Sequence, residues 1–176
     1  NFLNSPSTGN DPYGALYSGI QRANIVLRYI DQIPASGITE EDRSMIKGEA
    51  LFLRGYQYFL LVNNYKEVPL RLIPSNEDET NKAAATEAAL WAQVEEDLDN
   101  AIKCNLPVER STAKERITKG AAIAMLGKVY ATQHKYPEAK QLLGTLLKAP
   151  YSYELMDNFE KNFTNEEEFN KESVFE

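Results

Sequence analysis

Residues 48–70 read GEALFLRGYQYFLLVNNYKEVPL, and nearly every residue between positions 50 and 62 is apolar or aromatic. A helix with this composition has no wide polar face and needs cover on most of its sides. A membrane-spanning helix needs roughly 20 apolar residues in succession, and Arg54 interrupts this run well before that length. The pattern therefore predicts a central core helix. The side chains expected in the core are those of Ala50, Leu53, Phe59 and Leu60.

The boundaries and spacing of this helix can also be predicted. Thr39 is the expected N-cap, because acidic residues follow it and suit the positive end of the helix dipole. Gly48 and Gly55 are seven residues apart and share one face, where the missing side chains let another helix approach closely. The pair Val68-Pro69 ends the helix, since a residue before proline avoids helical geometry.

Four further segments are predicted to be helical. In residues 12–33 apolar side chains recur at intervals of three and four, and Pro12 suits the first turn. Residues 86–105 carry apolar side chains on one side and an acidic, solvated face on the other. Residues 118–134 and 137–148 complete the set, and no alternating strand pattern of any length is present. The remaining segments are predicted to be loops: 74–85, 105–115 and 151–176, the last with one turn of helix.

Residues 118–150 match the pattern of a tetratricopeptide unit, which is a helical hairpin of about 34 residues. Leu126 and Gly127 are adjacent, Tyr130 comes three residues after the glycine, and Ala139 precedes Leu143 by four. We expect the glycine and the alanine where the two helices cross closely, with the large residues around them. The predicted fold class is an all-α superhelix of tetratricopeptide-like hairpins with loop-rich connections. A generic helical hairpin at 118–150 is the alternative.

Composition limits the possible functions. The chain has 176 residues, the size of one domain, so residues 1–176 are taken as a single helical domain. Its net charge is -7 and it has no basic run, which argues against a nucleic-acid partner. A lone cysteine, Cys104, supplies neither an internal disulfide nor a thiolate metal site. Because no nucleophile–base pair, metal motif or phosphate-binding loop is present, the sequence predicts neither an enzyme nor a cofactor.

Glu49 and Arg54 are the charged residues most expected to be buried. Their spacing of five residues puts them on different faces of one helix, so each needs a partner elsewhere. Arg22, in the first predicted helix, is a candidate partner for Glu49. An active site and a structural ion pair would both bury such charges, and the structural interpretation is favoured.

Several short motifs occur in a characteristic order along the chain. They are Arg22-Ala23-Asn24; Gly48-Glu49-Ala50 followed by Phe52, Leu53 and Arg54; Val68-Pro69; Asp97-Leu98 with Ala101; and Glu172-Ser173 with Phe175. In combination they resemble the SusD/RagB family of bacterial outer-membrane nutrient-binding lipoproteins, over nearly the whole chain. One departure is Lys66-Glu67, where the family commonly has a glycine after the tyrosine. The resemblance therefore does not determine the shape of this turn.

The resemblance implies a tetratricopeptide-like scaffold that supports a loop-rich, ligand-binding portion. It also implies a surface-exposed outer-membrane lipoprotein that captures a glycan or another nutrient and presents it to a SusC-like TonB-dependent transporter. Family members extend beyond both ends of this sequence and begin with a lipoprotein signal and an anchoring cysteine. The chain is therefore expected to be a piece of a longer protein that binds weakly by itself. Structural roles are expected for Arg22, Asn24, Glu49, Arg54, Gly127, Tyr130 and Ala139.

Residues 1–17, which include the start of the first predicted helix, hold the candidates for ligand contact. Tyr13 stands where related sequences often carry a tryptophan, and an aromatic ring can stack on the apolar face of a sugar. Asn10 and Asp11 could bind its hydroxyl groups. The alternative is that Tyr13 only packs at the start of the helix.

Two other function classes stay open at this point. The helical pairs could bind a peptide in a concave groove, as tetratricopeptide arrays do without catalytic residues. An all-helical enzyme is the third class, and the absence of a catalytic constellation makes it the weakest.

Overall fold

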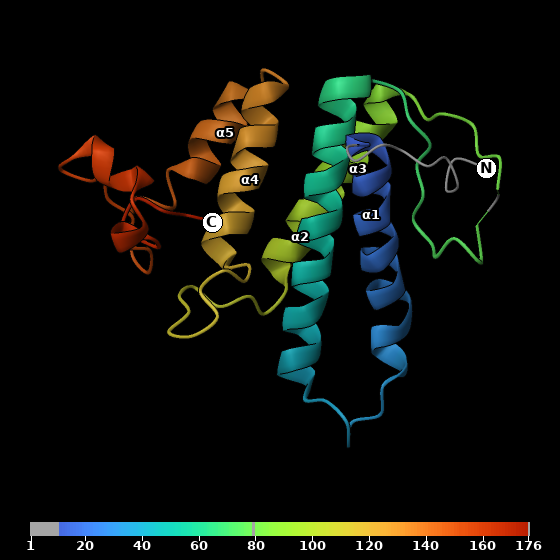
Figure 1. The fold of residues 1–176 in the computed structure, drawn as a ribbon, viewed down its shortest axis with the longest axis horizontal. Coiled ribbons are helices and arrows are strands. Elements are labelled where there is room, and N and C mark those ends of the chain that lie inside the picture. The colour runs from blue at the N-terminus through green and yellow to red at the C-terminus, as the bar shows by residue number, and fades with distance from the viewer. Residues whose placement is uncertain (1–10, 79, 176) are drawn as a thin grey trace.

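The computed structural model describes residues 11–78 and 80–175, and these residues form an all-α fold (Figure 1). Their α-helices are α1, Pro12–Tyr29; α2, Glu40–Tyr65; α3, Glu87–Lys103; α4, Lys119–Thr132; and α5, Tyr136–Leu143. Their 3₁₀ helices are η1, Ile30–Gln32; η2, Phe159–Phe163; and η3, Asn165–Glu167. No β-strand occurs in the described residues, which contain one isolated bridge between Pro69 and Ala84. The predicted all-α class is confirmed.

The starts of four helices follow from capping side chains. Asp11, Thr39, Thr86 and Thr118 each accept a hydrogen bond from a backbone N–H in the first turn of the next helix. These bonds satisfy donors that have no partner inside the helix. The expected N-cap at Thr39 is confirmed, and three acidic residues follow it in the first turn of α2.

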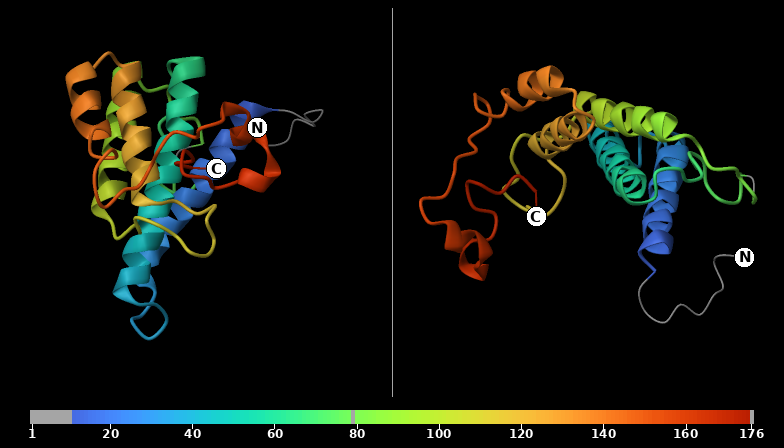
Figure 2. Two further views of the ribbon diagram at one scale, coloured as in Figure 1. Left: turned by 90° about the vertical axis from the view of Figure 1, so that its left-hand side faces the viewer. Right: turned by 90° about the horizontal axis from the view of Figure 1, so that it is seen from above.

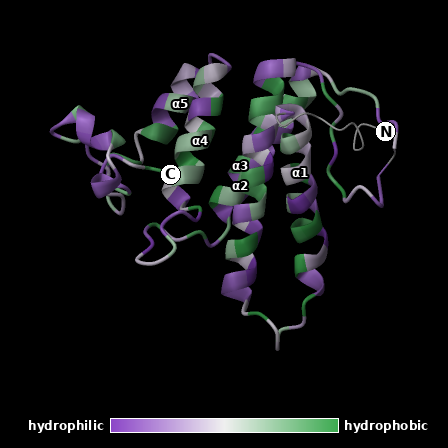
Figure 3. Ribbon diagram, viewed as in Figure 1, coloured by the Kyte–Doolittle hydropathy of each residue, from purple (hydrophilic) through white to green (hydrophobic). Residues whose placement is uncertain are grey.

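Each helix packs chiefly on its neighbours along the chain. Helices α1 and α2 form one hairpin, α3 packs on α2, and α4 and α5 form a second hairpin beside α3. Seen from above, α1 and α5 lie at opposite ends of this array (Figure 2). The end of α2 next to the loop that joins it to α1 is polar (Figure 3).

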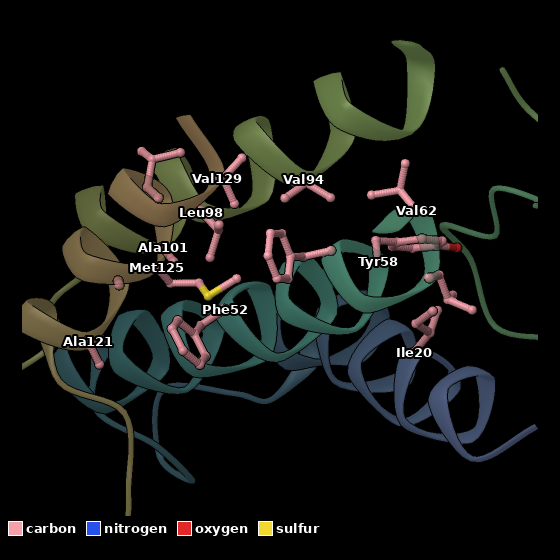
Figure 4. Close-up of a cluster of buried hydrophobic side chains, with 14 of the residues drawn as sticks. Ile20, Phe52, Tyr58, Val62, Val94, Leu98, Ala101, Ala121, Met125 and Val129 are labelled. Carbon is pink, nitrogen blue, oxygen red and sulfur yellow. The ribbon is translucent and has the colours of Figure 1, made fainter. Parts of the chain in front are cut away.

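Helix α2 supplies the centre of the hydrophobic core, as predicted. The largest fully buried apolar side chains lie on α1, α2 and α3, together with one on α4, and several are drawn in Figure 4: Ile20, Phe52, Tyr58, Leu61, Val62, Leu90, Val94, Leu98 and Val129. Ala50 and Phe59 are buried, as expected, and Leu60 is partly buried against the cluster.

The prediction for Leu53 was wrong. Its side chain is 41% exposed, although it lies in the most apolar part of α2. Helix α2 is covered by α1, α3 and α4, and these neighbours leave one stripe of its surface open in the described residues. An apolar sequence shows that cover is needed, but it does not show on which side the cover is missing.

The two glycines of α2 allow close approach, as predicted. A Cβ atom on Gly48 would lie 2.8 Å from the Cβ of Cys104 and 3.0 Å from the Cγ of Leu106. A Cβ atom on Gly55 would lie 3.1 Å from the Cγ of Leu98 on α3. Side chains at either position would therefore press on α3 or on the segment that follows it.

The predicted hairpin at 118–150 is present as α4 and α5. A Cβ atom on Gly127 would collide with the Leu143 side chain, and Leu126 and Ala139 are buried. Tyr130 packs partly buried against the core. Helix α5 ends at Leu143, five residues earlier than predicted, because Gly144 caps it and turns follow.

The turn after α2, whose shape the sequence left undetermined, is centred on Lys66. Lys66 has φ 65° and ψ -69°, and the N–H of Glu67 donates to the carbonyl of Tyr65 at 2.8 Å. This is a three-residue γ-turn of the strained kind, with a φ value that favours glycine. The turn after α2 is therefore sharp, and a lysine occupies its centre.

Residues 151–175, which we call the tail, lie outside the helical array (Figure 2). The predicted turn of helix is present as two short 3₁₀ helices, η2 and η3. None of the tail residues is buried. One contact with the array is the edge-to-face packing of Phe175 on Phe52, with ring centroids 5.4 Å apart.

Candidate functional site

A buried polar cluster joins the first three helices. The Arg54 guanidinium on α2 donates to both carboxylate oxygens of Asp97 on α3, at 2.8 and 2.7 Å. It also donates to the side-chain oxygen of Asn24 on α1, at 3.0 Å. Gln93 donates to the same carboxylate at 3.0 Å, and Asp97 is only 1% exposed. The expectation that Arg54 is buried with a partner outside its own helix is confirmed.

The same cluster fixes the loop after α2. The Asn24 amide donates to the carbonyls of Arg71 and Ile73, at 3.0 and 3.2 Å. A paired, hydrogen-bonded charge is the form in which burial is tolerated. The arrangement suits the structural roles predicted for Asn24 and Arg54, because it ties three helices and one loop together.

Glu49 is paired with two arginines that the sequence analysis did not name. Its Oε1 accepts from Arg110 at 2.6 Å, and its Oε2 accepts from Arg116 at 2.7 Å. The hydrogen bond that Arg116 donates to Glu49 raises the pKa of the Arg116 guanidinium. Arg22 is exposed on α1 and is not the partner of Glu49, so that suggestion was wrong. The loop between α3 and α4 carries both arginines to Glu49, which only the folded chain determines.

Asp11 and Tyr13 lie at the start of α1, and Asn10 lies outside the described residues. The Asp11 carboxylate accepts from the N–H of Tyr13 at 3.1 Å, which makes it the N-cap. The Tyr13 ring packs on Tyr17 with centroids 4.9 Å apart, and edge-to-face on Tyr65 at 5.1 Å. The structure thus brings the start of α1 and the end of α2 together in an aromatic cluster, Tyr13, Tyr17 and Tyr65.

This aromatic cluster rests on a loop that is held by tyrosine hydroxyls. Tyr17 donates to the carbonyl of Pro69 at 2.6 Å, and Tyr58 donates to the carbonyl of Arg71 at 2.9 Å. Burial raises the pKa of both phenols, so both stay protonated as donors. Tyr65 is 42% exposed and Tyr13 is half-buried, so ring surface is available at this end of the molecule.

The sequence analysis missed a second surface feature, a cleft beside Trp91. It lies between one face of α3 and the residues that join α4 to α5. Trp91 was assigned to the packing side of its helix and Glu95 to the solvated side. The cleft lies where these two sides meet, so neither assignment alone could reveal it.

Neither a metal site nor a membrane-spanning helix is found in the described residues. No group of three or more His, Cys, Asp or Glu side chains there is placed to hold a metal ion. None of the described helices is both long and apolar enough to cross a membrane.

Comparison with known proteins gives the family of this chain. A sequence model described as "Starch-binding associating with outer membrane", that of the SusD-like proteins, matches residues 4–131. The chain belongs to the SusD-like family. No match was found among curated protein sequences.

Solved structures of SusD-like proteins share the fold. A laminarin-binding SusD-like protein is 34% identical, with a TM-score of 0.85 over 93% of this chain. A SusD superfamily protein from Bacteroides vulgatus is also 34% identical, with a TM-score of 0.83 over 91% of this chain. A SusD-like protein from Bacteroides fragilis is 28% identical, with a TM-score of 0.82 over 94%. The chain spans about a third of the length of these relatives, 36%, 34% and 32% respectively.

Proposed function

We propose that this protein binds a glycan at the bacterial cell surface, without chemical turnover, and passes it to a SusC-like TonB-dependent transporter. The observation that carries the proposal is its family membership, together with 34% identity to a protein that binds laminarin. The aromatic cluster Tyr13, Tyr17 and Tyr65 supports it, because sugar rings stack on aromatic side chains.

Tyr13 is the residue we propose for stacking, with Asn10 and Asp11 as hydroxyl partners. Asp11 uses one carboxylate oxygen, Oδ1, to cap α1, and its side chain is exposed at the helix start. A capping carboxylate is fixed in position, which lowers the entropy lost when a hydroxyl group binds it.

The binding proposal is tested by isothermal titration of the complete gene product with laminarihexaose and a xylogluco-oligosaccharide. We expect saturable binding, and weaker binding by residues 1–176 alone, because a sugar site gathers contacts from several loops. Tyr13→Ala should weaken binding by about tenfold. Tyr29→Ala is the matched control, since Tyr29 is an exposed aromatic residue at the other end of α1, and it should bind as wild type.

Two outcomes would contradict different parts of this proposal. Hydrolysis of any of these glycans by the complete protein would contradict a purely binding role. Unchanged affinity of Tyr13→Ala would contradict the site assignment and leave the glycan-binding role in place.

The location and the partner require separate tests. We propose a lipid-anchored protein on the outer surface of the outer membrane, in line with the description of its family. Surface labelling of intact cells should reach the protein, and gentle solubilisation of outer membranes should recover it with a TonB-dependent transporter. Recovery from the cytoplasmic fraction would contradict both proposals.

A further inference from the structure

The cleft beside Trp91 has the size of a small-molecule site. Its volume is about 580 Å³, within the range of roughly 300–1,000 Å³ that is typical of such sites. Its lining residues come from α3 and from the link between α4 and α5, and they are Glu87, Ala88, Trp91, Ala92, Glu95, Gln133 and Lys135. Residues 87–135 therefore supply the whole lining, which includes an aromatic ring, two carboxylates, an amide and an ammonium group.

The indole ring of Trp91 is held in place from two sides. It packs edge-to-face on Phe59, with ring centroids 6.0 Å apart. Its Nε1–H donates to Glu87 Oε1 at 3.2 Å, and the same oxygen accepts from Lys66 at 3.0 Å. These two bonds, first that from Lys66 and then that from Trp91, hold the pKa of Glu87 below its ordinary value. The ring orientation is thus set before any ligand arrives.

The opposite wall is shaped by the end of α4. The N–H of His134 donates to the carbonyl of Ala131, and the N–H of Lys135 donates to that of Tyr130. His134 has φ 62°, so it occupies the left-handed position that glycine usually fills in this type of helix end. The reversal of the chain carries Gln133 and Lys135 toward α3.

Glu95 connects the two walls. Its Oε1 accepts from Gln133 at 2.6 Å and from Lys135 at 2.5 Å. The Lys135 ammonium group also lies 5.7 Å from the centre of the Tyr130 ring, which fixes its stem. Within residues 11–78 and 80–175, neither Glu87 nor Glu95 receives a hydrogen bond at Oε2. Each therefore keeps a fixed carboxylate oxygen that can accept from a ligand.

This combination fits a neutral sugar ring. The apolar face of a pyranose stacks on an indole, and its hydroxyl groups donate to carboxylate and amide oxygens. The two carboxylates against one lysine in the lining disfavour uronic or sulfated sugars. We propose that this cleft is a second glycan-contact site, which binds one neutral saccharide residue; it rests on the proposed glycan-binding function and is separate from the cluster at Tyr13.

Trp91 is the only tryptophan in the chain, so it reports on the cleft directly. Residues 1–176 are titrated with laminarihexaose and with a xylogluco-oligosaccharide, and the emission of Trp91 and the NMR resonance of its indole N–H are followed. We expect at least one of these neutral glycans to move both signals in a saturable manner. An oligogalacturonate, which is anionic, should leave them unmoved.

Variants separate the cleft from the rest of the surface. Trp91→Ala should lower the association constant of the glycan that moves the Trp91 signals by about tenfold. Because Trp91 also packs on Phe59, the unfolding curve of Trp91→Ala is recorded to check that this variant is folded. Glu95→Gln, which keeps the indole reporter, is a second variant, and its association constant should fall by about threefold. Phe163→Ala is the control, since Phe163 is 75% exposed and lies outside the cleft, and it should bind as wild type.

The possible failures are distinguishable. If a glycan binds the complete protein but neither glycan moves the Trp91 signals, the cleft proposal is wrong and the proposed function stands. If no glycan binds the complete protein, both are wrong. Equal losses in Trp91→Ala and Phe163→Ala would also overturn the cleft proposal, because they would indicate unspecific contact with exposed aromatic rings.

Discussion

The helical array, residues 12–146, and the tail, residues 151–175, both contain large apolar side chains. Many of these side chains are buried in the array, whereas none is buried in the tail. In the array, Phe52, Leu61 and Leu98 are at most 2% exposed. In the tail, Leu155, Phe159 and Phe163 are 71–78% exposed. The apolar residues of the array recur at helical spacing and so form faces that pack on each other, whereas those of the tail are irregularly spaced.

The two regions also use polar contacts differently. In the array the buried pair of Arg54 and Asp97 connects α2 and α3 through two residues that are 43 positions apart in the sequence. In the tail Glu172 accepts from the N–H of Met156 at 2.8 Å and from the Asn162 amide at 3.0 Å, all within the tail itself. Tertiary packing thus holds the array together, and local hydrogen bonds shape the tail. Substitutions should therefore cost most in the array.

The largest effect is expected from breaking the buried ion pair. Asp97→Ala leaves the Arg54 guanidinium without its carboxylate and should lower the free energy of unfolding by about 3–5 kcal/mol. Lys103→Ala is the control, because it breaks an exposed ion pair with Asp99 and should cost about 0–1 kcal/mol. Urea denaturation measures both. Equal losses would show that the buried cluster does not hold the array together.

Leucine truncations within α2 test the core. Leu61 is fully buried, so Leu61→Ala should cost about 2–5 kcal/mol. Leu53 is 41% exposed on the same helix, and Leu53→Ala should cost about 0.5 kcal/mol or less. A large loss at Leu53, measured by the same denaturation, would mean that another part of the molecule covers this stripe of α2.

Side chains added at Gly48 and at Gly127 should destabilise the protein to different extents, because the atoms they meet differ in how easily they can shift. In Gly48→Val the new side chain meets the Cβ of Cys104, which is attached directly to the backbone, so a loss of about 1–3 kcal/mol is expected. In Gly127→Ala the new methyl group meets side-chain atoms of Leu143 beyond its Cβ, and this residue is 36% exposed, so it has room to shift. The second variant should therefore lose less, and thermal unfolding of both variants would reveal the reverse order if packing at α4 were tighter.

Lys66→Gly is expected to stabilise the protein. The strained φ of Lys66 costs energy that glycine avoids, and this gain exceeds the loss of the exposed bond to Glu87 and the larger chain entropy of glycine. The free energy of unfolding should rise by about 1 kcal/mol. Lys66→Ala keeps the strain and also loses the bond, so it should be less stable than wild type. A Lys66→Gly variant weaker than Lys66→Ala would contradict a strained turn.

The smallest effect is expected in the tail. Phe159 packs on Phe163 but is 71% exposed, so Phe159→Ala should change the free energy of unfolding by less than about 0.5 kcal/mol. If this variant lost as much stability as Leu61→Ala, the tail would belong to the same cooperative core as the array.

The sequence by itself determined the features that depend on near neighbours in the chain. The N-cap at Thr39 bonds three residues away, and the period of apolar residues within α2 shows that it needs cover. The close contact at Gly127 was predicted from the residue spacing within one helical hairpin. The position of Tyr13 at the start of α1 was predicted from the adjacent Pro12 and the helical period that follows. These features were predictable because their causes lie within a few turns of helix.

Only the tertiary structure decided which distant groups meet. Arg54 pairs with a carboxylate 43 residues away, and Glu49 with arginines 61 and 67 residues away. Helical periodicity places Asp97 on the apolar side of α3, which indicates that its carboxylate is buried. Which residue pairs with Asp97 depends on how α2 and α3 cross. The Trp91 cleft and the open stripe at Leu53 likewise depend on the placement of whole helices, because small changes in a crossing angle decide which side chains touch and which face solvent.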